Sequence, residues 1–130
     1  MNQVTVPSTD IARSKAFYEG LGLRLIVDTP HYLRFECPEG GATFSCALTD
    51  QAPDGAGPSV KVYFEYDRDR LDREAARLVA AGYVIDQMPA DQRYLWREAR
   101  LRDPDGNHLV LYHAGENRRF PPWRVSEESA

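Results

Sequence analysis

Apolar and polar positions alternate along the chain with two different periods, and these periods predict its elements. A period of two marks strands, because side chains alternate between the two faces of a sheet, whereas apolar residues at i, i+4 and i+7 mark a helix. Leu71, Ala75 and Leu78 follow the helical spacing. The pattern predicts one helix from residues 9–11 to 20–22, another over 68–81, and strands over 3–6, 23–27, 32–37, 43–48, 60–66, 84–88, 94–102 and 108–112.

Short polar residues and glycines mark where these elements begin and end. Asp10, or Thr9 before it, can cap the first helix, because a side-chain oxygen accepts the free amide hydrogens of the first turn. Gly20 and Gly22 provide the left-handed residue that ends many helices. The segment 103–107 predicts a tight hairpin turn through its proline and glycine, and it lacks the closing glutamate of a calcium loop.

The order of elements is βαβββ, and it occurs twice. Each helix can cover only one face of its strands, so the other face must meet the second unit or another chain. We therefore predict an α+β fold in which two βαβββ modules form an open eight-stranded mixed barrel, as one domain over 1–130. Its parts are module one at 1–49, a linker rich in Pro, Gly, Ala and Asp at 50–59, module two at 60–114 and a C-terminal arm at 115–130.

Composition narrows the classes of partner. The net charge of −4 over 130 residues argues against a nucleic-acid partner, which requires a basic face. The N-terminus lacks a basic segment followed by an apolar run, and no apolar stretch is long enough to span a bilayer. These features predict a cytoplasmic protein with no membrane partner. Cys37 and Cys46 predict reduced, buried thiols, with a hairpin disulfide between them as the alternative.

Five segments occur in an order and spacing typical of a known family. They are Gln3-Val-Thr-Val-Pro7, Asp10-Ile-Ala-Arg-Ser-Lys-Ala-Phe-Tyr18 with Leu21-Gly-Leu23, Phe64-Glu65, Ala80-Ala-Gly82 and Arg102-Asp-Pro-Asp-Gly-Asn107. Together they span about residues 3–112 and resemble the vicinal oxygen chelate superfamily. This group includes glyoxalase I, extradiol dioxygenases, fosfomycin-resistance enzymes and bleomycin-resistance proteins.

The resemblance implies a divalent metal held by strands of both modules, at positions that correspond here to Gln3, the neighbourhood of Ser45, Lys61 and Val110. Gln3 can ligate a metal, but Val110 has no donor atom and the Lys61 cation would repel one. Divalent ions need several converging oxygen or nitrogen donors. The departure from the family pattern predicts no metal, no cofactor and no catalytic residue.

The two-residue period predicts which side chains share the inner face of the barrel with Lys61 and Val110. On the strand before the hairpin turn, Leu95, Ala99 and Leu101 are expected beneath a helix, which turns the alternate residues inward. Aromatic walls with a few fixed charges are typical of a small-molecule cleft. Tyr94, Glu65 and His108 are expected on this face, and the predicted ligand-binding residues are Gln3, Ser45, Lys61, Tyr63, Trp96, Glu98, Arg100 and Tyr112.

These observations predict a metal-independent small-molecule binding protein that sequesters an aromatic antibiotic or metabolite. Its aromatic residues would stack on a planar ligand, and Lys61 or Arg100 would attract an anionic group such as a carboxylate or phosphate. The resemblance also implies a homodimer. Phe120 and Trp123 in the C-terminal arm would suit such an interface.

Two alternatives remain open. One is a metal-dependent glyoxalase-like lyase or dioxygenase with an atypical site built from Gln3, His108 and either Glu98 or Glu65. The other is a structural dimerisation module in which Lys61 pairs with Glu98 or Glu65 and fills the barrel, because buried unpaired charges are costly. Chelator-sensitive turnover would indicate the first alternative, and a face that accepts no ligand would indicate the second.

Overall fold

A computed structural model describes residues 1–51 and 60–125, and it confirms the two predicted βαβββ units. The predicted linker falls almost entirely outside these residues, as does the end of the predicted arm. The first unit contains β1 (Gln3–Ser8), α1 (Ile11–Leu21), β2 (Arg24–Asp28), β3 (Tyr32–Glu36) and β4 (Thr43–Leu48). The second contains β5 (Lys61–Glu65), α2 (Arg68–Ala80), β6 (Ile85–Asp91), β7 (Arg97–Arg102) and β8 (His108–His113), followed by the short 3-10 helix η1 (Gly115–Arg118).

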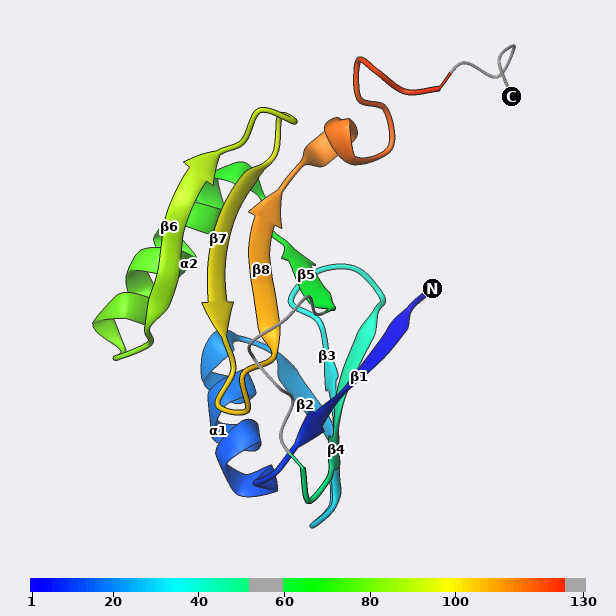
Figure 1. Ribbon diagram of the computed structural model, residues 1–130, viewed down its shortest axis with the longest axis vertical. Helices are drawn as coiled ribbons and strands as arrows, with labels where there is room; N and C mark the ends of the chain where they lie inside the picture. The colour runs from blue at the N-terminus through cyan, green and yellow to red at the C-terminus, as the bar shows by residue number, and fades with distance from the viewer. Residues whose placement is uncertain (52–59, 126–130) are drawn as a thin grey trace.

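The eight strands form two four-stranded mixed sheets, ordered β1-β4-β3-β2 and β5-β8-β7-β6. Figure 1 shows α1 along one side of the first sheet and α2 along one side of the second. No strand ladder joins the two sheets within the described ranges, so they do not close into a barrel. The predicted α+β class and open arrangement are confirmed. No helix in the described part of the chain is long and apolar enough to cross a membrane.

Both helices pack into one apolar core that the two units share. Leu71, Ala75 and Leu78 of α2 are fully buried, as their spacing predicts. The rings of Phe44 on β4 and Phe64 on β5 meet edge-on with centroids 5.4 Å apart, so the core is continuous from one unit to the other. This shared core packs the two units against each other.

The turn between β7 and β8 docks along α1, from the residue before its N-cap to its last turn. The Tyr18 hydroxyl donates to Asp103 Oδ2 at 2.6 Å, and the Thr9 backbone N–H donates to Asp105 Oδ1 at 2.9 Å. Asp103 Oδ1 accepts from the backbone N–H groups of Asp105 and Asn107 at 3.0 and 2.8 Å. The hairpin turn predicted at 103–107 is thus confirmed, and its carboxylates also join the two units.

The structure corrects one strand and decides the state of the cysteines. The strand predicted over 94–102 begins at Arg97, and Leu95 is half exposed in the preceding loop and does not lie beneath a helix. Cys37 and Cys46 are both free, as the first reading of the sequence predicts. Burial raises the pKa of the Cys46 thiol to about 12, so this thiol is unreactive at neutral pH.

Candidate functional site

Three aromatic side chains touch one another on the uncovered face of the second sheet, and we call them the aromatic cluster: Tyr63 of β5, Trp96 beside β7 and Tyr112 of β8. Trp96 and Tyr112 are stacked, with ring centroids 4.8 Å apart and planes at 27°. Tyr63 meets Trp96 and Tyr112 edge-on at 6.0 and 5.4 Å. Tyr63 is 41% exposed and Tyr112 is buried at 6%, so Tyr63 is the ring that the cluster presents to the solvent.

The five residues between β6 and β7, 92–96, form a loop that sets the position of Trp96. The Gln92 backbone N–H donates to the Trp96 carbonyl at 2.7 Å, and that of Leu95 donates to the Gln92 carbonyl at 3.0 Å. Leu95 has a φ of 67°, a left-handed conformation that loops of this kind normally give to glycine. The Tyr94 ring meets Trp96 edge-on at 5.9 Å, so the loop adds a fourth ring at the edge of the cluster.

An ion pair lies beside the aromatic cluster. Arg100 Nη2 donates to Glu98 Oε1 at 3.0 Å, and the Glu98 side chain is only 1% exposed. The β7–β8 register sets Glu98 opposite Tyr112 and Arg100 opposite Val110, which places both charges on the face of the cluster. The hydrogen bond to Glu98 raises the pKa of Arg100, and burial together with Glu98 raises the pKa of Tyr94.

Three buried polar atoms on this face have no hydrogen-bond partner among the described residues: Glu98 Oε2, Arg100 Nε and His108 Nε2. His108 shares the face because it precedes Val110 by two residues on β8, and it lies opposite Lys61 of β5. A buried polar group without a partner costs about 1–3 kcal/mol, and native structures contain few of them. These atoms therefore have unmet hydrogen-bonding capacity, which a ligand can use once the side chains that cover them move.

Gln3 and Ser45 lie together on the uncovered face of the first sheet. Gln3 Nε2 donates to Ser45 Oγ at 2.8 Å, and the Thr43 hydroxyl donates to Gln3 Oε1. The Tyr32 hydroxyl donates to Ser45 Oγ at 2.7 Å, and its hydrogen bonds with Ser45 and Arg34 lower the pKa of Tyr32. The polar groups of this second set are thus satisfied within the chain.

The eight predicted ligand-binding residues fall on two faces. Gln3 and Ser45 belong to the first sheet, while the other six gather on the second. The two groups approach each other where Gln3 and Tyr63 line a small cavity of about 100 Å³. The predicted inward turn of Glu98 and Arg100 agrees with the register, and Ala99 and Leu101 pack into the core on the opposite side.

The structural alternative requires Lys61 to pair with Glu98 or Glu65, and the described residues show neither pair. Glu98 pairs with Arg100, and Glu65 Oε2 accepts from the backbone N–H groups of Ala114 and Gly115, both at 2.9 Å. Lys61 is exposed on the same face as the aromatic cluster, not buried in a closed barrel. The sequence places His108 on this face by its period, but no sequence signal shows that its Nε2 is unpaired.

The residues at the family's metal positions do not fit a divalent ion. Val110 is buried and has no donor atom, Lys61 contributes a cation, and the Gln3 amide is engaged with Ser45 and Thr43. Within residues 1–51 and 60–125, no group of three or more His, Cys, Asp or Glu side chains is placed to hold a metal. We therefore derive no chemistry that passes through a bound metal.

Comparisons with known proteins place the chain in a family. The model of the Glyoxalase/Bleomycin resistance protein/Dioxygenase superfamily matches residues 1–111, and the chain belongs to this superfamily. No curated protein matches the sequence.

Solved structures resemble the chain in fold at low sequence identity. A glyoxalase/bleomycin resistance protein/dioxygenase from Nocardioides has a TM-score of 0.75 at 20% identity, covering 96% of this chain and 88% of that one. A bleomycin-binding protein complexed with bleomycin gives 0.70 at 21% identity, covering 87% and 96%. Lactoylglutathione lyase from Agrobacterium tumefaciens gives 0.68 at 17% identity, covering 87% and 92%.

Proposed function

We propose that the protein binds a planar, partly polar small molecule without a metal ion and sequesters it in the cytoplasm. The observation that carries this proposal is the aromatic cluster, with Tyr63 at its exposed edge, beside the unpartnered atoms of Glu98, Arg100 and His108. Aromatic walls supply apolar contact area in ligand sites, and a few polar atoms fix the orientation of the ligand. A face with only a structural role would be expected to satisfy such atoms internally.

The family supports this proposal at the level of ligand class. One structural neighbour is described as a bleomycin-binding protein in complex with bleomycin. For the present chain we propose an aromatic antibiotic or metabolite as the ligand, with the aromatic cluster stacking on its ring. Another neighbour is a lactoylglutathione lyase, so turnover of a related substrate is the contrary outcome that the experiments must address.

A thermal-shift screen of aromatic antibiotics and organic acids on chelator-treated protein tests ligand binding. Tyr63→Leu removes the exposed ring of the cluster and should weaken binding of any compound found about fivefold, because an aromatic contact contributes roughly 1 kcal/mol. Val79→Ala is the matched control, since Val79 is an exposed apolar residue on α2, away from the aromatic cluster. Equal affinities for Tyr63→Leu and the unaltered protein would refute the role of the cluster.

Equilibrium dialysis against nickel, zinc, manganese and iron tests independence from metals. We expect no stoichiometric uptake, because the candidate positions offer a valine, a lysine and an engaged glutamine. One ion bound per chain at micromolar affinity would defeat the proposal. Chelator-sensitive turnover of the methylglyoxal–glutathione adduct or of a catechol would then identify an enzyme.

We also propose that two copies of the chain associate. Each sheet has one face without a helix, and Phe120 and Trp123 after η1 are each 57% exposed. Burying such aromatic residues is a common feature of interfaces. Sedimentation equilibrium should give twice the mass of one chain. A single-chain mass at all concentrations would contradict the association without affecting the proposal on ligand binding.

A further inference from the structure

We infer that the ligand carries an anionic oxygen group, and that Arg100, His108 and Lys61 bind this group around Val110. The inference rests on the proposed function, because it assigns the charge of the ligand that the same face would bind. The shared chemistry is that of an oxyanion, a carboxylate or a phosphate, attached to an aromatic ring.

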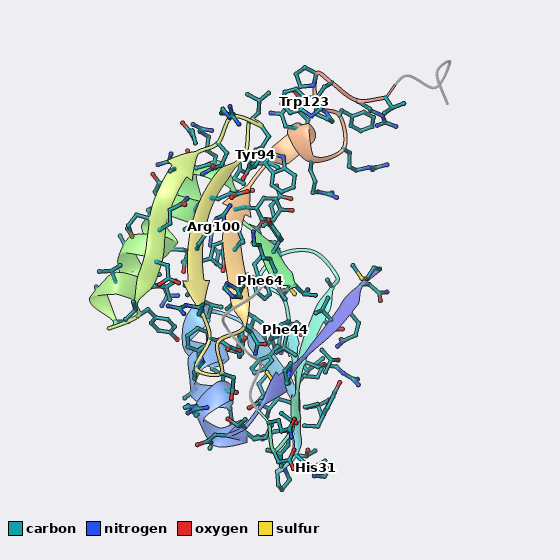
Figure 2. All side chains as sticks on the ribbon, viewed as in Figure 1. His31, Phe44, Phe64, Tyr94, Arg100 and Trp123 are labelled. Atoms are coloured by element: carbon teal, nitrogen blue, oxygen red, sulfur yellow. The ribbon has the colours of Figure 1, made fainter. Side chains whose placement is uncertain are left out.

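The strand register places two nitrogen-bearing side chains and one tyrosine around Val110. Arg100 lies opposite Val110 on β7, Tyr63 lies opposite it on β5, and His108 precedes it by two residues. Such diagonal neighbours on one sheet face lie within reach of a common group. Arg100 Nε and His108 Nε2 are buried without partners, and the side chain of Val110 has no polar atom that would compete for them. Figure 2 shows Arg100 near the middle of β7, with Tyr94 nearer the C-terminal segment.

The balance of charge on the face favours an anion. Glu98 is neutralised by Arg100, and Glu65 is held by two backbone N–H groups and by Arg118 Nε at 3.5 Å. Arg102, which lies opposite His108, pairs with Asp86 at 3.1 Å. No ion pair involves Lys61 within the part of the chain that the structure describes, so its exposed ammonium, opposite His108, can attract an anion.

Glu98 supports this subsite by holding Arg100. A substitution of Glu98 can therefore distinguish an anionic ligand from a cationic one. Glu98→Gln keeps the shape and the acceptor oxygen toward Arg100 but removes a negative charge near the subsite. The substitution should strengthen the binding of an anion. A ligand that used Glu98 as its own counter-ion would instead bind more weakly after the same change.

Four probes with one ring system separate charge from stacking: 2-naphthoate, 2-naphthamide, 2-naphthamidine and 2-naphthyl phosphate. The first three have planar groups of similar shape with charges of −1, 0 and +1. Isothermal titration calorimetry should show 2-naphthoate or 2-naphthyl phosphate binding at least about tenfold more tightly than the amide, since hydrogen bonds to charged groups are the stronger ones. The amidine should bind most weakly. The tighter of the two anions identifies the oxyanion.

Single substitutions locate the subsite. Lys61→Gln, Arg100→Gln and His108→Phe should each weaken 2-naphthoate binding at least about threefold while changing 2-naphthamide binding less, because charge-assisted hydrogen bonds are lost. Lys61→Arg should retain the affinity. Arg24→Gln, which removes an exposed cation from β2, is the matched control and should change nothing. Lys61 is exposed, so its variant remains informative even if a variant of Arg100 fails to fold.

The outcomes separate this inference from the proposed function. Tight binding of 2-naphthamide with no preference for the anions would overturn the inference and leave the proposed function standing. Preference for the amidine, or weaker binding of 2-naphthoate by Glu98→Gln, would also overturn it. Absence of binding by all four probes would count against both.

Discussion

Two fully buried tyrosines that differ in hydrogen bonding provide an internal comparison. Tyr18 is 0% exposed and donates to Asp103 Oδ2 at 2.6 Å, whereas Tyr66 is 1% exposed and its hydroxyl has no partner among the described residues. Replacement by phenylalanine removes one oxygen from each. A hydrogen bond to a charged group contributes roughly 1.5–3 kcal/mol, so Tyr18→Phe should lower the free energy of unfolding by about 2 kcal/mol. Tyr66→Phe should leave it unchanged or raise it by up to about 1 kcal/mol, because an unsatisfied buried hydroxyl disappears.

Urea unfolding monitored by circular dichroism measures both differences at pH 7. The slope of free energy against urea should stay constant, which shows that the two variants unfold to similar states. Because Tyr18 and Asp103 join α1 to the β7–β8 turn, the loss in Tyr18→Phe would fall on the contact between the two units. Equal losses in the two variants, or a larger loss in Tyr66→Phe, would refute the assignment of these hydrogen bonds.

Three further predictions follow from the structure. Burial raises the pKa of Tyr66 from 10.0 to about 12, so the unfolded chain ionises first and the free energy of unfolding is fully retained below pH 10 and falls as the pH rises through 12. Between pH 9 and pH 12, the free energy of unfolding of Tyr66→Phe, measured with urea, should therefore fall by about 2 kcal/mol less than that of the unaltered protein. Equal falls in the two proteins would contradict this prediction. Leu95 has a left-handed backbone, so Leu95→Gly should be about 1 kcal/mol more stable than Leu95→Ala. On the exposed face of α2 the order should be reversed, and Ala76→Gly should be less stable than the unaltered protein. Glycine that is less stable than alanine at both sites would contradict backbone strain at Leu95. Gly20→Ala should lower the melting temperature although alanine favours helices, because the new Cβ would collide with the Tyr83 hydroxyl. In a Tyr83→Phe background the same substitution should raise the melting temperature. A rise in both backgrounds would show that the Tyr83 hydroxyl does not obstruct this position.

Local periodicity was sufficient to predict most elements, because each one buries a single face. Strand β4 begins and ends at the predicted residues, and the buried face of α2 follows from Leu71, Ala75 and Leu78. The start of β7 could not be predicted, since Leu95 and Trp96 continue the alternation of a strand. The left-handed loop at Leu95 has no glycine to reveal it. Tertiary contacts of the Tyr94 and Trp96 rings accompany this conformation, and a pattern of residue types does not contain such contacts.

In the candidate site, too, the sequence predicts which face of the sheet a side chain occupies but not which residue it pairs with. The alternation of side chains along β7 correctly places Glu98 and Arg100 on one face of the sheet and Ala99 and Leu101 on the other. Which cation neutralises Glu98 depends on side-chain reach across a folded sheet; the sequence names Lys61 only in one alternative, and the structure gives Arg100. That Gln3 approaches the aromatic cluster only at Tyr63 likewise depends on how two sheets meet without a shared ladder.

The indole N–H signals of the two tryptophans provide the most direct test of binding at the aromatic cluster without a metal. Trp96 stacks on Tyr112, whereas Trp123 is exposed in the C-terminal segment, and Trp123→Phe assigns the two signals in a proton–nitrogen correlation spectrum. In the presence of a chelator, titration with 2-naphthoate should shift the Trp96 signal to saturation and leave that of Trp123 in place. A Trp96 signal that stays fixed, or that moves only after a divalent metal is added, would contradict the account.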